Sequence, residues 1–211
     1  MTHLQINHDP EPIRLFKSDF LEFFTHIHPA VVVIIWLPVA MFFLFREIAT
    51  RDVTVSPIYI PICVVAGLFL WTLVEYTLHR FLFHFEPRNP AQEKIIYLFH
   101  GIHHEQPQCK TRLVMPPAAS IPMAIVIYGL LYLVVGLLLR LPHLVNPLTT
   151  GLLLGYLAYD MTHYATHHLP MRGKVLKYLK RYHMMHHYKT PDQRFGVSSP
   201  LWDIIFQTKP H

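Results

Sequence analysis

The chain has 211 residues, of which 52% are hydrophobic and 15% are charged, and its net charge is +5 at pH 7 with histidine neutral. The charged fraction lies well below the roughly 25% of an average soluble domain, so the composition argues against a soluble domain and indicates a membrane protein. The positive charge is explained by membrane topology, and no motif supports nucleic-acid binding. The two cysteines lie in an apolar run (Cys63) and a polar loop (Cys109), so no disulfide is expected.

The first half of the chain contains two predicted membrane spans. Residues 1–28 are polar, lack the apolar core of a signal peptide, and are predicted to form a cytoplasmic or interfacial segment. Residues 29–46 and 55–78 are apolar and about as long as a bilayer-spanning helix requires. A short polar turn from Arg46 to Asp52 is predicted between them. The second span continues into His79 and His84, so one helix is expected to leave the bilayer carrying both histidines.

The second half repeats this organisation. A polar segment, 85–112, carries the motif His-x-x-His-His and is followed by predicted spans at about 118–139 and 147–165. The fourth span ends in His163 and His167, and a basic, polar remainder, 169–211, carries a second His-x-x-His-His. Each half thus consists of a predicted hairpin of two spans, a histidine pair and a histidine triplet. This organisation is an internal repeat. We predict a single domain at 29–211.

The histidine spacing predicts a metal site. In both halves, the first histidine of the triplet lies 16 positions after the last histidine of the pair. One such triplet could occur by chance in a chain with 17 histidines, but two in register at the ends of two spans are not expected among ordinary surface histidines. Neutral imidazole binds zinc, iron, copper and nickel. Ten ligands exceed what one ion takes, so we predict a site for two ions, formed by His79, His84, His100, His103, His104, His163, His167, His183, His186 and His187.

Helix geometry indicates which of these histidines can bind the same ion. His163 and His167 are four residues apart and lie on one helix face, so they can share an ion. His79 and His84 are five residues apart, or about 140° on an α-helix, so they either serve different ions or need a distorted turn. Acidic and phenolic side chains are candidates to orient the ligating rings: Glu75, Asp160, Asp203 and Tyr164.

Charge distribution predicts the orientation. Fifteen of the 18 Lys and Arg residues fall on the histidine side of the predicted spans, and three fall on the other side (Arg46, Arg51 and Arg140). By the positive-inside rule, both termini and all ten histidines are cytoplasmic. The predicted fold class is an all-α integral membrane protein, with four transmembrane helices in two hairpins and a cytoplasmic, helical, histidine-rich cap that holds a dimetal site.

Several strings resemble a known family. They are EYTLHRFLFH at 75–84, HGIHH at 100–104, RLVMPP at 112–117, GYLAYDMTHY at 155–164, and HMMHH at 183–187 with FGVSS at 195–199 and LWD at 201–203. Together they resemble the fatty acid hydroxylase (sterol desaturase) superfamily of membrane-bound, histidine-rich oxygenases. Within it, HRFLFH, RLVMPP and YDMTHY resemble the fatty acid 2-hydroxylases. The resemblance covers residues 70–208 strongly and the first span weakly.

The resemblance implies an oxidoreductase (a monooxygenase) that uses O₂ to hydroxylate C2 of a long acyl chain, as a free fatty acid or in a ceramide. It implies that the ten histidines are the ligands, with iron expected for activity and zinc able to occupy a purified sample. Many eukaryotic members carry an N-terminal cytochrome b5 domain, for which 28 residues leave no room. The electrons are therefore expected from an external donor, a cytochrome b5 or a ferredoxin with its reductase. The expected location is a bacterial inner membrane, or the endoplasmic reticulum of a eukaryote.

Other readings remain open at this point. The histidines alone also fit sterol desaturation, C4-methyl oxidation, and alkane-type or carotenoid hydroxylation, although the strings between the histidines argue against these reactions. A metal transporter, a haem-binding membrane protein or a structural zinc protein belongs to a different class. A transporter would place its ligands near the bilayer midplane, whereas these histidines lie beyond the ends of the predicted spans.

Overall fold

The computed structural model describes residues 6–7, 9 and 11–210. Within this part of the chain the regular structure is helical and contains no strand. The remaining residues of the predicted N-terminal segment, 1–5, 8 and 10, lie outside the described residues. The elements in chain order are α1 (Asp19–Phe23), α2 (Pro29–Thr50), α3 (Tyr59–Leu78), η1 (His79–Phe83), α4 (Pro90–Ile96), η2 (Tyr97–Gly101), α5 (Ile102–Glu105), α6 (Pro117–Leu131), η3 (Tyr132–Leu138), η4 (Pro142–Leu144), α7 (Val145–His168), α8 (Lys174–Tyr188) and α9 (Leu201–Ile205).

The chain divides into two compact units. The helical unit comprises Ala30–Trp71 and Pro116–Ala158, and the histidine unit comprises Met1–Pro29, Thr72–Met115 and Tyr159–His211. The long helices α3 and α7 each contribute residues to both units. All ten predicted ligands belong to the histidine unit.

Among the described residues, three helical segments are long and apolar enough to cross a membrane. They are Pro29–Thr50, Tyr59–Phe83 and Pro117–Leu138, and they correspond to the first three predicted spans. The helix that covers the predicted fourth span, α7, has 24 residues but carries Asp160, His163 and His167. That span stays a prediction.

The polar turn predicted at Arg46–Asp52 is wrong in its first part. Helix α2 continues to Thr50, and Glu47 is buried in the helical unit. The Glu47 carboxylate accepts hydrogen bonds from the Tyr59 hydroxyl at 2.5 Å and from the Asn146 amide at 2.9 Å. Because these bonds compensate the buried carboxylate, the helix can carry it.

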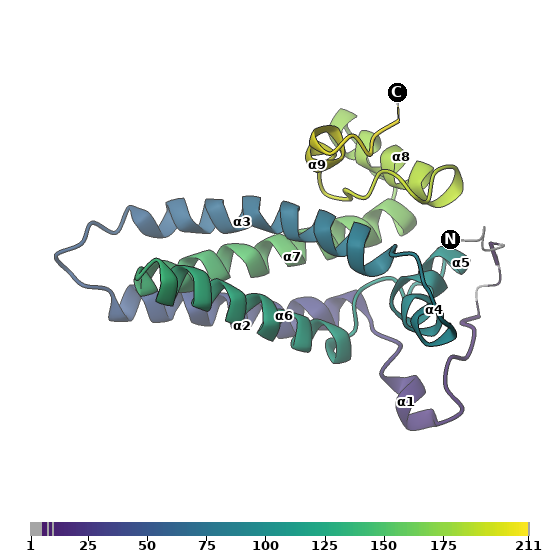
Figure 1. Ribbon diagram of the computed structural model, residues 1–211, viewed down its shortest axis with the longest axis horizontal. Helices are drawn as coiled ribbons and strands as arrows, with labels where there is room; N and C mark the ends of the chain where they lie inside the picture. Colours follow the sequence, from purple (N-terminus) through teal and green to yellow (C-terminus); the bar gives the residue numbers. More distant parts are fainter. Residues whose placement is uncertain (1–5, 8, 10, 211) are drawn as a thin grey trace. The chain divides into compact units, whose positions relative to one another are not determined.

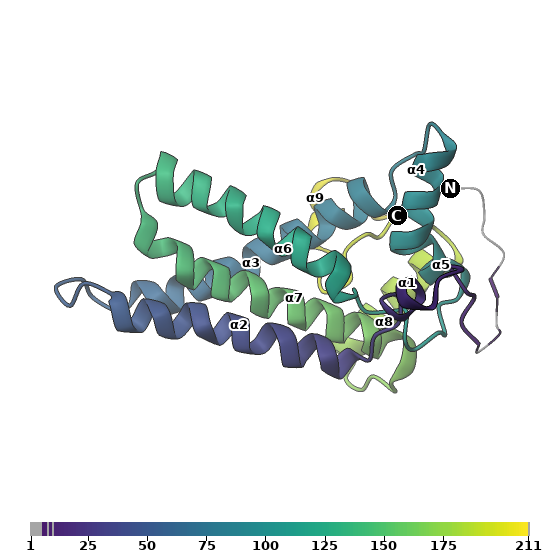
Figure 2. The ribbon, with the colours of Figure 1, turned by 90° about the horizontal axis from the view of Figure 1, so that it is seen from below.

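Close contact between glycines holds α3 against α7 in the helical unit. A Cβ on Gly67 would lie 2.3 Å from the Leu148 carbonyl oxygen, and one on Gly151 would lie 2.2 Å from the Val64 carbonyl oxygen. Gly155, four residues after Gly151, faces the Trp71 side chain. Small residues at this spacing allow the backbones of membrane helices to approach closely. Figures 1 and 2 show that consecutive long helices of this unit run in opposite directions with their axes roughly aligned.

Helix α2 also packs against α7. The Trp36 and Tyr156 rings meet edge to face at 5.9 Å, and the Thr150 hydroxyl donates to the Ala40 carbonyl at 3.3 Å. The Trp36 indole donates to the Ser120 hydroxyl of α6 at 3.2 Å. This last bond gives two buried side chains a polar partner.

Candidate metal centre

The histidine unit gathers the ten predicted ligands into two groups of five. Group A consists of His79, His84, His100, His104 and His186, and group B consists of His103, His163, His167, His183 and His187. Within each group, one ring nitrogen from every residue lies within 4.8 Å of the others. Among the described residues these are the groups of side chains able to hold a metal ion. This gathering supports the prediction of a site for two ions, which stays a prediction.

The two triplets are each divided between the groups. The first triplet gives His100 and His104 to group A and His103 to group B, while the second gives His186 to group A and both His183 and His187 to group B. On a helix, residues three and four apart lie on one face but not at one point. A triplet can therefore reach two neighbouring ions.

A π-helical turn explains how His79 and His84 come to share a group. The five residues of η1, His79–Phe83, form a π-helical turn directly after α3. Hydrogen bonds in a π-helix join residues five apart, so they bring such residues one above the other, and these turns recur at functional sites. The two rings lie 4.9 Å apart. The distorted turn is therefore present, and it places both residues in group A.

A second π-helical turn, η2 at Tyr97–Gly101, precedes the remainder of the first triplet in α5. The second triplet lies in α8, which is an ordinary α-helix. The pair His163 and His167 lies on α7, and both residues belong to group B, as the four-residue spacing predicts.

The distances between ring nitrogens match those expected between metal ligands. In group A, His100 Nε2 lies 3.0 Å from the Nε2 atoms of both His79 and His104. In group B, His183 Nε2 lies 2.9 Å from His167 Nε2 and 3.0 Å from His187 Nε2. A nitrogen ligand lies about 2.0–2.1 Å from zinc, so ligands at right angles are about 2.8–3.0 Å apart and tetrahedral ligands about 3.3–3.4 Å apart. The observed distances are therefore short enough for these nitrogen atoms to share one ion.

Burial keeps these imidazoles neutral, which is the form that binds a metal ion. Removal from water disfavours the charged ring. It lowers the pKa of His104 and of His167 to about 3 and places the pKa values of His100, His103 and His187 well below the usual 6.5. Neighbouring histidines lower these pKa values further.

His84 provides the test of fit. Both of its ring nitrogens are buried and have no hydrogen-bond partner among the residues that the structure describes, although buried polar atoms are nearly always paired. The ring lies 4.8–4.9 Å from the rings of His79, His100, His104 and His186. A metal ion among these neutral imidazoles would satisfy one nitrogen of His84, so the residues present fit a metal ion.

Backbone carbonyls orient two rings of group A. The Nδ1 atom of His79 donates a hydrogen bond to the Phe195 carbonyl, and that of His186 donates to the Gln193 carbonyl at 2.7 Å. A neutral imidazole carries one N–H, so these bonds leave Nε2 of both rings unprotonated and free to act as a ligand. Both carbonyls belong to the segment 193–198, here called the 193–198 loop. The family-like string at 195–199 was the sequence signal for this loop, but the role of its carbonyls was not predicted.

The other predicted residues have different surroundings. Glu75 and Asp203 are buried and bind the backbone of the 193–198 loop. Asp160 is buried on α7, one turn before His163. The Tyr164 ring contacts the His168 ring at 4.8 Å, and His168 lies outside both histidine groups.

The chain matches one protein family and proteins from plants, animals and yeasts. The fatty acid hydroxylase family model matches residues 64–208. A dihydroceramide fatty acyl 2-hydroxylase of Arabidopsis thaliana is 40% identical over 197 residues, which cover 93% of this chain and 80% of the plant protein. The fatty acid 2-hydroxylase of Homo sapiens is 38% identical, and the match covers 97% of this chain and 60% of the human protein.

A solved structure has the same fold. It is that of full-length scs7p, in which only the hydroxylase domain is visible. The TM-score is 0.83 at 34% sequence identity, and the match covers 93% of this chain and 72% of that one. With a family match over most of its length and relatives of this similarity, the chain belongs to the fatty acid hydroxylase family.

Proposed function

We propose that this protein hydroxylates C2 of a long-chain fatty acyl group, either free or in a ceramide. The observation that carries the proposal is the pair of five-histidine groups, which offers neutral imidazoles to two ions. The reaction class is supported by relatives named as fatty acid 2-hydroxylase and dihydroceramide fatty acyl 2-hydroxylase. Per acyl chain, the reaction would consume one O₂, two electrons and two protons, placing one oxygen atom in the C2 hydroxyl and the other in water.

The chain's own residues would bind two ions and keep their ligands in the right protonation state. Iron, bound by all ten histidines, would supply the redox chemistry that breaks an unactivated C–H bond, which zinc cannot supply. The burial of the rings excludes water and holds them neutral. The carbonyls of Gln193 and Phe195 fix the rings of His186 and His79 so that Nε2 is the ligating atom.

We further propose four membrane spans, with residues 147–165 of α7 as the fourth and with the histidines and both termini on the cytoplasmic side. Three candidate spans and the strong excess of basic residues on the histidine side of the chain support this topology. The division into an N-terminal segment, 1–28, and a hydroxylase domain, 29–211, belongs to the same proposal, as does an external electron donor, a cytochrome b5 or a ferredoxin with its reductase.

Exposed aromatic residues support an interfacial N-terminal segment. In α1, Phe20 and Phe23 are 71% and 74% exposed, and the first candidate span begins six residues after this helix. Apolar side chains so close to a span fit the boundary between headgroups and acyl chains. Arg112, in the RLVMPP string, holds the segment through the Ile13 carbonyl and the Glu22 carboxylate.

The test uses purified, iron-loaded protein with a reductant and O₂. A fatty acid, a ceramide and a sterol are supplied separately, with the acyl chains carrying two deuterium atoms at C2. The expected product gains one oxygen and keeps one deuterium, as read by mass spectrometry. His103→Ala should abolish the product, whereas His143→Ala, at an exposed histidine outside both groups, should not. Oxidation of the sterol with no acyl product would contradict the proposal.

A further inference from the structure

We infer that Glu75 and Asp203 are positioning residues for group A, acting through the backbone of the 193–198 loop. The inference rests on the proposed dimetal centre and adds to it a difference between the two ions. Glu75 and Asp203 lie 128 positions apart in the sequence, and each is almost completely buried in the histidine unit. Their oxygen atoms bind consecutive parts of the loop that contacts His79 and His186.

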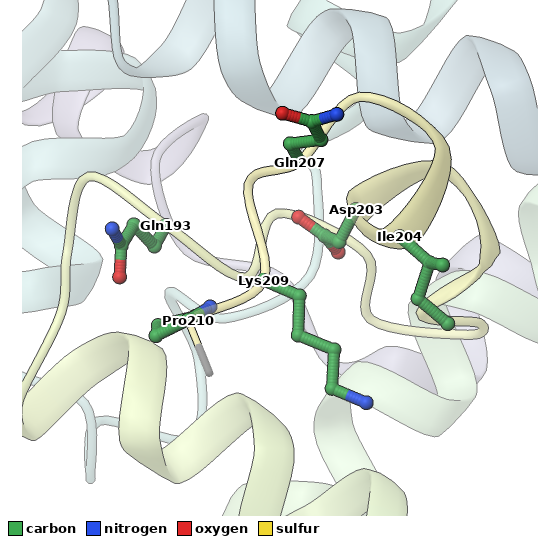
Figure 3. Close-up of a pocket in the computed structure, with 6 residues that line it drawn as sticks. All are labelled: Gln193, Asp203, Ile204, Gln207, Lys209 and Pro210. Atoms are coloured by element: carbon green, nitrogen blue, oxygen red, sulfur yellow. The ribbon is translucent and has the colours of Figure 1, made fainter.

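Asp203 accepts hydrogen bonds from the middle of the loop. Its Oδ1 atom accepts hydrogen bonds from the Phe195 backbone N–H at 2.8 Å and from the Thr208 hydroxyl at 2.7 Å, and its Oδ2 atom accepts from the Gly196 N–H at 2.8 Å. Asp203 thus accepts a hydrogen bond from the N–H of Phe195, and the carbonyl of the same residue accepts one from His79. Asp203, Gln193, Gln207 and Lys209 are among the residues that line a cavity of about 780 Å³. Figure 3 shows these side chains.

Glu75 holds the second half. Its Oε1 atom accepts from the backbone N–H groups of Val197 at 2.6 Å and Ser198 at 2.8 Å, and its Oε2 atom accepts from the Ser198 hydroxyl. Glu75 lies four residues, or about one helical turn, before His79. The end of this helix therefore carries both a predicted ligand, His79, and the carboxylate that binds the loop in contact with that ligand. The position of the Phe195 carbonyl relative to His79 is thereby fixed from both sides.

The loop needs this restraint because its backbone is strained. Arg194 lies between the two carbonyls that contact histidines and has φ = 62°, a left-handed conformation that is uncommon for a residue other than glycine. Such conformations persist where surrounding contacts hold them, and they cluster at functional sites. Here the left-handed residue separates the Gln193 carbonyl, on His186, from the Phe195 carbonyl, on His79.

Both positions need hydrogen-bond acceptors, because each carboxylate accepts two backbone N–H groups and a hydroxyl. Asp203 takes one backbone N–H on each oxygen, so Asp203→Asn would turn an NH₂ donor toward a backbone N–H in either orientation. Glu75 takes both backbone N–H groups on one oxygen, and a glutamine there could donate its NH₂ to the Ser198 hydroxyl. Glu75→Met, which has a similar length and no oxygen acceptor, is therefore the variant that releases this part of the loop.

The release should affect one group and spare the other. Both loop carbonyls contact group A rings. In group B, the Nδ1 atoms of His183 and His187 have no hydrogen-bond partner in the described structure. Changing the outer partners of metal ligands typically weakens metal binding about 10- to 100-fold. We expect this loss for one ion in each variant and unchanged affinity for the other.

The experiment measures metal binding by the full chain in detergent and needs no substrate. Wild type, Glu75→Met and Asp203→Asn are loaded with ⁵⁷Fe(II), titrated against a chelator and examined by Mössbauer spectroscopy. Wild type should hold two ions, and each variant should lose one about 10- to 100-fold more readily, with a changed spectrum for that ion alone. Glu22→Gln is the matched control, because Glu22 also accepts two backbone N–H groups, those of Leu15 and Phe16. It should keep two ions at wild-type affinity.

Double variants identify the ion that is lost. Adding His186→Ala, in group A, to Asp203→Asn should remove no further ion, whereas adding His187→Ala, in group B, should remove the second. Ser198→Ala deletes one hydrogen bond and serves if the Glu75 and Asp203 variants fail to fold; it should weaken the same ion by a smaller factor. Wild-type affinity for both ions in every folded variant would overturn the positioning role. A wild type that binds no ion would instead overturn the proposed dimetal function.

Discussion

His186 and His187 are consecutive residues of α8 that belong to different histidine groups. The ring of His186 lies 4.7 Å from that of His79 in group A, and the ring of His187 lies 4.5 Å from that of His103 in group B. The two rings are 5.6 Å apart and nearly perpendicular to each other, at 84°. Consecutive residues of α8 therefore contribute to different groups: His186 belongs to group A, whereas His187 belongs to group B together with His183.

This relationship predicts that single histidine variants lose different ions. His186→Ala should weaken the ion of group A, and His187→Ala should weaken that of group B, because each removes one of five ligands from one group. Each variant should retain about one tightly held ion per chain, measured by metal analysis after dialysis against a chelator. The double variant should retain none. Two ions in both single variants would contradict the assignment of ligands.

The pKa values predict how the metal-free protein responds to pH. The ordinary histidine pKa is about 6.5, and burial lowers that of His104 to about 3 in the folded protein. Between these two values the unfolded chain binds protons that the folded chain does not, so stability falls as the pH is lowered below about 6.5. Above pH 7.5 both states are neutral at these histidines, and they add no pH dependence.

Thermal unfolding of the metal-free protein at pH 7.5, 6.5 and 5.5 measures this effect. The melting temperature should fall in the more acidic buffers, and the fall should be smaller in a His103→Gln, His104→Gln variant, which has two fewer buried imidazoles. A melting temperature that does not change between pH 7.5 and 5.5 would show that these histidines are not kept neutral by the fold.

Gly196→Ala should strongly destabilise the histidine unit and weaken metal binding. A Cβ at this position would lie 2.0 Å from the Ser199 carbonyl oxygen and 3.0 Å from Asp203 Oδ2. The backbone would have to move, which would break the bond between the Gly196 N–H and Asp203. The expected loss is about 2 kcal/mol or more, as for other substitutions that force a buried backbone to shift. Thermal unfolding and metal content are the measurements, and wild-type values of both would refute the crowding described at this turn.

Gly151→Ala tests the contact between α3 and α7. The new methyl group would meet the Val64 carbonyl oxygen at 2.2 Å, so the two helices must separate and lose packing along their length. Gly129→Ala is the control, because a Cβ there has no neighbour within 4 Å and alanine favours the helix. The melting temperature in detergent should fall for Gly151→Ala and stay the same or rise for Gly129→Ala. Equal melting temperatures would argue against close packing at Gly151.

The sequence by itself determined which ten histidines gather in the folded chain and the helical architecture of their surroundings. The ten histidines stand out because the 16-residue spacing and the triplet are repeated, and the first three predicted spans correspond to apolar helices because uncharged runs of that length are distinctive. Local helix periodicity was also sufficient to place His163 and His167 in one group, since residues four apart share a helix face.

Only the tertiary structure decided how the ligands divide and what orients them. His79 joins His84 because the chain forms a π-helical turn, which the regular 3.6-residue period does not predict. Glu47 continues a helix where its charge predicts a turn, because Tyr59 and Asn146 arrive from distant parts of the chain to bind it. The carbonyls on His79 and His186 come from a loop fixed by Glu75 and Asp203. Backbone atoms leave no residue-specific pattern, so their role as partners depends on long-range contacts that only the folded chain provides.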